Sequence, residues 1–118
     1  MSNLEEFYAS VDSDAAQVID RLGGMPALVV RFLTKFKNDG SFNELCAALD
    51  SGDTETAFRA AHTLKGVCAT LGIQSVFRQA SAITELLRGD ALNEARAAMP
   101  ALRQVYEQAI DALNKLTA

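Results

Sequence analysis

Excess positive charge and long apolar segments are both missing from this chain. Its 118 residues include 11 Lys and Arg against 15 Asp and Glu, which gives a formal net charge of −4. Nucleic-acid binding needs a basic surface, so this charge argues against a nucleic-acid partner. No uninterrupted apolar run approaches the roughly 18–20 residues of a membrane span, so we expect no membrane segment. The acidic N-terminus, MSNLEE, also lacks the basic and apolar regions of a signal peptide.

Cysteine and histidine are scarce as well. The two cysteines, Cys46 and Cys68, both fall on apolar faces of expected helices, where a thiol packs as a small hydrophobe. Unpaired thiols fit a reducing cytoplasm, which is the location we expect. One histidine and no carboxylate cluster of metal-ligand spacing lead us to expect neither a metal ion nor a cofactor. No phosphate-binding glycine loop or kinase motif is present, which argues against nucleotide-dependent catalysis.

Helical periodicity is the main positive signal. Hydrophobic residues make up 49% of the chain and recur at helical spacing, without any alternating β pattern, internal repeat or low-complexity tract. Capping boxes of Ser2 with Glu5 and of Ser41 with Glu44 are expected to open two of the helices. Turn and cap residues divide the chain into expected helices over 3–9, 14–22, 26–38, 42–50, 54–71, 74–88 and 91–116.

The short loops between the longer segments favour antiparallel neighbours. We therefore expect an all-α fold, an antiparallel up-down four-helix bundle with short N-terminal capping helices. Residues 1–118 would form a single domain, in which 1–24 are the capping helices and 26–117 the bundle, broken near residue 40. Pro100 lies inside the last expected helix, so we predict a kink near residues 97–100, or two abutting helices.

The histidine, His62, lies within the helix expected over 54–71. At 100° per residue, His62 points toward water, opposite the apolar stripe of that helix. The stripe consists of Ala57, Ala60, Leu64, Cys68 and Leu71. Five residues share the face of His62. They lie between one turn before it and two turns after it, and they are Phe58, Arg59, Lys65, Gly66 and Ala69. A side chain that titrates near neutral pH therefore stands beside a cation and beside a residue without a side chain.

Gly66 requires an explanation, because glycine inside a helix costs about 1 kcal/mol relative to alanine. It could be a tolerated surface glycine or one needed for tight helix packing, although it faces away from the apolar stripe. Alternatively, its missing Cβ would let another molecule approach the imidazole closely. A lone exposed histidine is common on protein surfaces, and it is the combination with Lys65 and Gly66 that indicates chemistry at His62.

The motif His62-Thr63-Leu64-Lys65-Gly66 resembles the signature of histidine-containing phosphotransfer (HPt) domains. The family pattern is an alanine, a histidine, then a lysine three, a glycine four and a glycine ten residues after the histidine. The corresponding residues here are Ala61, His62, Lys65, Gly66 and Gly72. Phe32 and Phe36 resemble the family's aromatic positions on the preceding helix, and Gly52-Asp53 resembles the turn before the histidine helix. The resemblance covers roughly residues 20–116.

This resemblance implies a phosphocarrier of a two-component phosphorelay rather than an enzyme. His62 would accept a phosphoryl group from a receiver-domain aspartate and pass it to another receiver. Lys65 would offset the phosphoryl charge, and Gly66 would give access. The docking residues would be Ala69, Phe58 and Arg59. The partners would be receiver domains of response regulators or hybrid histidine kinases, with no nucleic acid and no membrane, and the carrier is expected to be a monomer.

Two positions depart from the family pattern. Val67 stands where the family often has serine or alanine, at the edge of the apolar stripe, so packing is expected to absorb the change. Thr84 aligns with a position on the next helix where many members carry a glutamine or glutamate that hydrogen-bonds the histidine. Threonine reaches less far, so we assign Thr84 no role.

Two other functions stay open. The chain could be a helical docking module whose histidine is never phosphorylated. It could also be the phosphoacceptor domain of a chemotaxis-type histidine kinase, phosphorylated by a kinase active site instead of a receiver. The chain begins with Met and ends shortly after its last expected helix, which favours a free-standing protein.

Overall fold

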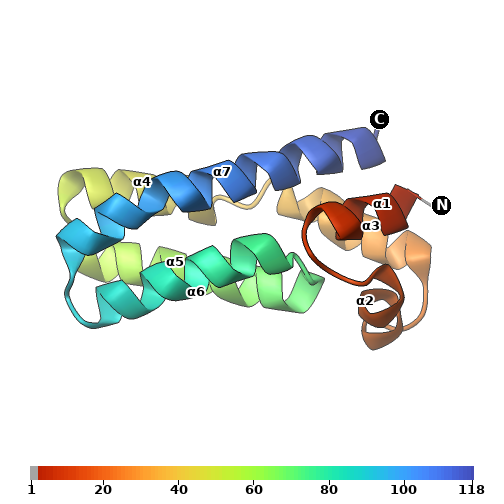
Figure 1. Ribbon diagram of the computed structural model, residues 1–118, viewed down its shortest axis with the longest axis horizontal. Coiled ribbons are helices and arrows are strands. Elements are labelled where there is room, and N and C mark those ends of the chain that lie inside the picture. Colours follow the sequence, from red (N-terminus) through yellow and green to blue (C-terminus); the bar gives the residue numbers. More distant parts are fainter. Residues whose placement is uncertain (1–2) are drawn as a thin grey trace.

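The computed structural model describes residues 3–118, and over these residues the chain is all-helical without a strand (Figure 1). The helices are α1 (Asn3–Ser10), α2 (Ala15–Arg21), α3 (Pro26–Phe36), α4 (Ser41–Ser51), α5 (Thr54–Leu71), α6 (Gln74–Arg88) and α7 (Leu92–Leu116). The prediction of an all-α fold is confirmed, and α5 and α6 have the predicted bounds.

The four helices α4 to α7 surround a common core (Figure 1). Helix α5 packs against α4 and α6, and α6 packs against α7. Helix α7 also contacts α4, because the rings of Phe42 and Tyr106 stack with their centroids 4.1 Å apart. The Arg96 guanidinium of α7 donates two hydrogen bonds to the Leu49 carbonyl of α4, at 2.9 and 2.7 Å. These contacts close a ring of four helices.

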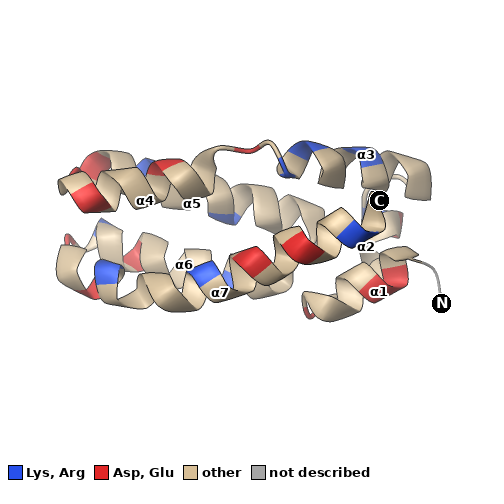
Figure 2. Cartoon of the chain, turned by 90° about the horizontal axis from the view of Figure 1, so that it is seen from above, with Lys and Arg blue, Asp and Glu red and all other residues tan. Residues whose placement is uncertain are grey.

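Helices α3 and α4 lie roughly end to end, separated by residues 37–40 (Figures 1 and 2). The break expected near residue 40 is therefore where the sequence predicts it. Ser41 is the first residue of α4, and its backbone N–H donates to the Asp39 carboxylate at 2.8 Å. The N-cap of α4 is Gly40, so the prediction that Ser41 caps this helix is wrong. The expected capping box of Ser2 with Glu5 lies outside the described residues, because Ser2 does.

Helix α7 runs unbroken from Leu92 to Leu116 through Pro100, so the alternative of two abutting helices is wrong. The other alternative, a kink near residues 97–100, stays a prediction. Pro100 itself is exposed. Proline removes only its own backbone hydrogen bond and strains the preceding turn. Ala95 and Leu102, on either side of it, are fully buried and hold both parts of the helix on the same core.

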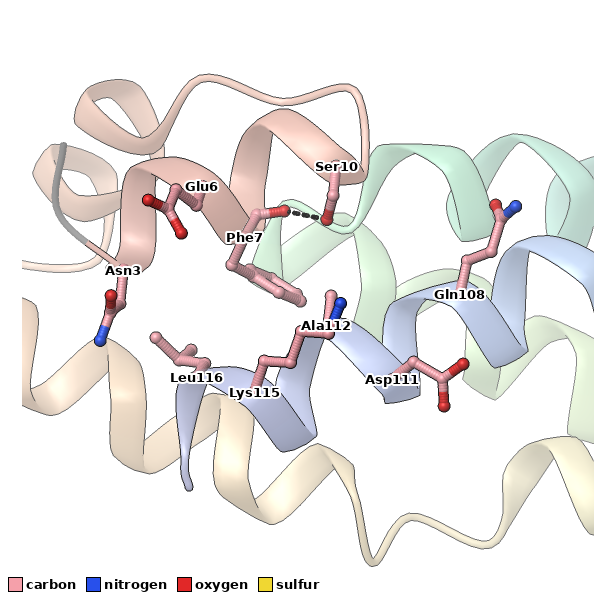
Figure 3. Close-up of a pocket in the computed structure, with 9 residues that line it drawn as sticks. All are labelled: Asn3, Glu6, Phe7, Ser10, Gln108, Asp111, Ala112, Lys115 and Leu116. Carbon is pink, nitrogen blue, oxygen red and sulfur yellow. Dashed lines mark hydrogen bonds between the residues drawn. The ribbon is translucent and has the colours of Figure 1, made fainter.

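The N-terminal helices pack at the opposite end from the α6–α7 turn (Figure 1). Helix α1 lies against the C-terminal part of α7, and residues of both helices line an open pocket of about 440 Å³. Figure 3 shows the Phe7 ring of α1 reaching toward Ala112 of α7. Helix α2 reaches the end of α5, because Arg21 donates to the carbonyls of Ala69 and Thr70 at 3.1 and 3.0 Å.

The turn after α5 depends on Gly72. Its backbone is left-handed, with φ of +74°, as in many helix-ending glycines. The Ser13 hydroxyl donates to the Gly72 carbonyl, and the buried Tyr8 hydroxyl donates to the Leu71 carbonyl at 2.8 Å. A Cβ on Gly72 would collide with the methyl groups of Val18. Gly72 therefore lets α1 and α2 close onto the end of α5.

Gly72→Ala is expected to lower the free energy of unfolding by about 2–5 kcal/mol. The left-handed backbone costs a side chain about 1–2 kcal/mol, and overpacking adds about 1–3 kcal/mol. Gly52→Ala is the matched control, since Gly52 ends α4 with φ of +76° but its Cβ would approach only the Arg96 guanidinium, at 3.7 Å. Urea unfolding compares the two variants. Equal losses of stability at both positions would contradict the packing role of Gly72.

Candidate functional site

His62 lies near the middle of α5 with an exposed side chain, in agreement with the predicted orientation. The residues of the predicted apolar stripe, Ala57, Ala60, Leu64, Cys68 and Leu71, are all buried. The Asp53 carboxylate caps α5 by accepting hydrogen bonds from the Thr56 hydroxyl at 2.7 Å and the Thr56 N–H at 3.1 Å. These bonds favour the ionised form and lower the pKa of the Asp53 carboxyl. The cap fixes where α5 begins and hence which way His62 points.

Apart from Arg59, the other α5 residues predicted for the site lie on the same side of the helix as His62. The Phe58 ring is half-buried, with its centroid 5.9 Å from that of the imidazole of His62. Lys65 is half-buried, while Gly66 and Ala69 are exposed. The structure therefore places an imidazole, an aromatic ring, a lysine and a residue without a side chain on one side of α5.

Arg59 is exposed and directed away from this group. Its guanidinium Nη2 donates to the Thr56 hydroxyl at 3.4 Å, toward the N-terminus of α5. Arg59 is thus the one predicted docking residue whose side chain points away from the imidazole.

Gly66 is not explained by helix packing. A Cβ at this position would meet no atom of the described residues within 4 Å, apart from the helix's own backbone. The bare backbone faces open space, next to a groove of about 430 Å³ between α5 and the end of α3. The groove is lined by Phe32, Lys35, Phe36, Asn38, Asp39, Gly66, Val67, Thr70 and Leu71. Phe32 and Phe36, which the sequence pattern singles out, and Val67, which departs from it, thus share one groove.

The groove has a basic flank on α3. Figure 2 shows Lys and Arg positions on α3 and no acidic one between Pro26 and Phe36. Among these basic residues, Lys35 lines the groove. A molecule seated beside Gly66 would therefore meet aromatic and aliphatic side chains together with one cation, Lys35, and one anion, Asp39.

Thr84 does not reach His62. It is fully buried on α6, and its hydroxyl donates to the Ala80 carbonyl one turn earlier, at 2.7 Å. Thr84 therefore supplies no orienting hydrogen bond to the imidazole, in agreement with its short reach. The α6 residue whose carboxyl responds to the charge of His62 is Glu85, which is exposed. The hydrogen bond from Arg88 lowers the pKa of the Glu85 carboxyl, and the charges of Arg88, Lys65 and His62 lower it further.

Arg88 connects α6 back to α5. Its Nε lies 2.8 Å from Oε2 of Glu85, and its guanidinium carbon lies 5.0 Å from the centroid of the Phe58 ring. Sequence reasoning missed both Glu85 and Arg88. The apolar stripe of α6 is the signal that could have found Glu85. Because Ala80 is in this stripe, Thr84, four residues later, lies on the same core-facing side, and Glu85, one residue further on, faces outward.

The two cysteines are both free. Cys68 is buried in the core, and burial raises the pKa of its thiol, so the thiol stays protonated as a small apolar group. Cys46 is half-buried, and its Sγ accepts a hydrogen bond from the Arg103 guanidinium at 3.4 Å. The packing role expected for Cys68 is confirmed.

Within residues 3–118, no group of three or more His, Cys, Asp and Glu side chains is placed to hold a metal ion. None of the helices formed by these residues is long and apolar enough to span a membrane.

Comparison with known proteins identifies the class. The family model described as the Hpt domain matches residues 30–114, well over half of the chain. The protein therefore belongs to the Hpt domain family, as the motif around His62 indicates. Hpt domains are phosphocarriers for histidine phosphotransfer in two-component phosphorelays, and they interact with receiver domains. No curated protein and no solved structure matches this chain.

Proposed function

We propose that this protein carries a phosphoryl group on His62, which it accepts from a receiver-domain aspartate and passes to a second receiver. The observation that carries the proposal is the exposed imidazole of His62 in the middle of α5, inside the region that matches the Hpt domain. His62 is the one histidine in the sequence, so no second imidazole competes for the role. Lys65 and Gly66 on the same face support it.

The transfer step needs only the imidazole from this chain. A neutral ring nitrogen attacks phosphorus, an N–P bond forms, and the P–O bond to the aspartate breaks with its electron pair left on the carboxylate. We assign the attack to Nε2, which projects farthest from the helix, while Nδ1 keeps its proton through the step. The ring must be neutral for this attack, because the attacking nitrogen gives its lone pair to phosphorus. The receiver supplies the acidic pocket and the Mg²⁺ that stabilise the transferring group.

Surrounding residues assist this step in the proposal. Gly66 leaves room for the receiver surface, and Phe58 and Ala69 offer it apolar contact. Arg59, which points toward Thr56, contacts the receiver at the edge of this surface.

Lys65→Ala is expected to shorten the lifetime of the phosphohistidine by up to about fivefold and to slow transfer more strongly. Phosphorylation adds about two negative charges. An exposed ion pair is worth about 0–1 kcal/mol, and more once a docked receiver excludes water. Lys115→Ala, on the C-terminal end of α7, serves as the control. Decay and transfer rates equal to those of the wild type would remove Lys65 from the mechanism.

We further propose that residues 1–118 form one cytoplasmic, monomeric domain. In this proposal, residues 26–117 are an antiparallel up-down four-helix bundle, and residues 1–24 cap one end of it. The contacts of Tyr8 with Leu71 and of Ser13 with Gly72 support the capping role.

The proposal is tested by incubating the protein with a panel of phosphorylated receivers. We expect at least one receiver to give an acid-labile, base-stable phosphoryl group on this chain. Labelling by a kinase active site alone would instead make the chain the phosphoacceptor domain of a chemotaxis-type kinase. If neither receivers nor a kinase label the chain, the remaining function is that of a helical docking module.

A further inference from the structure

Glu85 and Arg88 form an ion pair on α6 that the transfer step leaves unused. The side chains are more than half exposed, at 58% for Glu85 and 55% for Arg88. Ion pairs between such exposed groups contribute little to stability, because water competes for both partners. The pair can therefore open without disturbing the fold.

Arg88 is held near His62 by a contact that does not involve Glu85. Its guanidinium lies over the ring of Phe58, and the Phe58 ring in turn neighbours the imidazole. A cation over an aromatic ring is attracted by the negative face of that ring. Breaking the bond to Glu85 would therefore leave Arg88 anchored one ring away from the phosphoryl acceptor.

Glu85 lies within electrostatic reach of the same acceptor. The charges of Lys65 and His62 both contribute to lowering the pKa of its carboxyl, after the larger effect of Arg88. The charged side chains whose fields meet near the imidazole are Lys65 from α5 and Glu85 and Arg88 from α6. Two further carboxylates, Glu55 and Asp90, line the groove that Phe58 and Arg88 share. A phosphoryl group with about two negative charges would thus arrive beside an ionised carboxylate and within reach of two cations.

We propose that Glu85 and Arg88 act as a charge switch that responds to phosphorylation of His62. In the unphosphorylated protein, Glu85 holds Arg88. In the phosphorylated protein, the new negative charge repels Glu85 and attracts Arg88, which turns on its Phe58 anchor to donate N–H bonds to the phosphoryl oxygens. The planar guanidinium suits two phosphate oxygens at once.

The switch gives the Glu85 carboxylate a function. Glu85 competes with the phosphoryl group for Arg88, so the phosphorylated form is stabilised less than it would be by two unopposed cations. A carrier must release its phosphoryl group to the next receiver, and this competition keeps the group transferable. The inference rests on the proposed function, because it takes His62 as the phosphoacceptor.

The test uses the full chain phosphorylated by phosphoramidate, a small donor that needs no receiver. In this reaction the N–P bond of the donor breaks, ammonia leaves, and an N–P bond forms at the imidazole. The pKa of the phosphoryl group is then measured by ³¹P NMR titration, together with its hydrolysis rate at fixed pH. The switch predicts shifts of opposite sign. Arg88→Gln raises the phosphoryl pKa by about 0.2–0.7 units, and Glu85→Gln lowers it by a similar amount.

The matched control is the ion pair of Arg78 and Asp12, which is 3.1 Å long and equally exposed, at 54% and 56%. Arg78→Gln and Asp12→Asn are expected to leave the phosphoryl pKa unchanged. Shifts of the same sign in Glu85→Gln and Arg88→Gln, or no shift beyond that of the controls, would overturn the switch while leaving the carrier function intact. Failure of His62 to be phosphorylated by any donor would overturn the proposed function and the switch with it.

Discussion

His62→Gln is expected to fold like the wild-type protein and to accept no phosphoryl group from any receiver. Glutamine offers an amide in place of a nucleophilic ring nitrogen, so the N–P bond cannot form. The fold should tolerate the change because the side chain is exposed, and surface substitutions away from special features usually stay within about 0.5 kcal/mol. Labelling with a phosphorylated receiver measures the loss, and urea unfolding measures the stability.

A histidine moved to another helix tests whether phosphorylation needs the surroundings of His62 or only an exposed imidazole. Gln104 is exposed on α7, so Gln104→His in the His62→Gln background restores an exposed ring on another helix. We expect this double variant to stay unlabelled by receivers, because Lys65 and the bare backbone of Gly66 are not beside the new ring. Labelling of either variant at the wild-type rate would show that the acceptor is not His62 in its setting on α5.

Gly66→Leu is expected to slow transfer from a receiver by about 5- to 150-fold. A leucine here meets no other part of the described molecule at its Cβ, so α5 should remain intact. The side chain would instead occupy the space that the receiver needs beside His62. Overpacking a close contact costs about 1–3 kcal/mol, which corresponds to this range of rates. Stopped labelling reactions with one phosphorylated receiver give the rate.

Two controls assign this loss to docking. Gly66→Ala should fall between the wild type and Gly66→Leu, and Gln104→Leu, which adds the same side chain to an exposed position of α7, should transfer normally. Phosphoramidate should still label Gly66→Leu, because a small donor does not need the space. Receiver transfer at the wild-type rate in Gly66→Leu would contradict the proposed access role.

Local signals were sufficient to predict α5. Asp53 at its start and Gly72 at its end have strong conformational preferences of their own, and both predicted bounds are correct. The course of α7 could not be predicted in the same way. Pro100 argues locally for an interruption, whereas the burial of Ala95 and Leu102 depends on neighbouring helices that the local sequence does not reveal.

The candidate site also has a part that the local sequence predicts and a part that it does not. His62, Lys65 and Gly66 lie on one helix, so helical periodicity alone placed them on one face. The part contributed by α6 depends on how that helix is rotated against α5, and a shift of one residue turns a side chain by 100°. The α6 position that the family pattern points to, Thr84, lies in the core, whereas Glu85 and Arg88 are exposed on the same helix.

The most direct test of phosphoryl transfer to His62 is ¹⁵N NMR of the imidazole after incubation with a phosphorylated receiver. Because the sequence has one histidine, selective labelling gives signals from only two ring nitrogens. We predict that coupling to phosphorus appears at Nε2 while Nδ1 shows none. Phosphoryl label incorporated into the chain while both nitrogen signals remain unchanged would contradict the assignment of His62 as the phosphoacceptor.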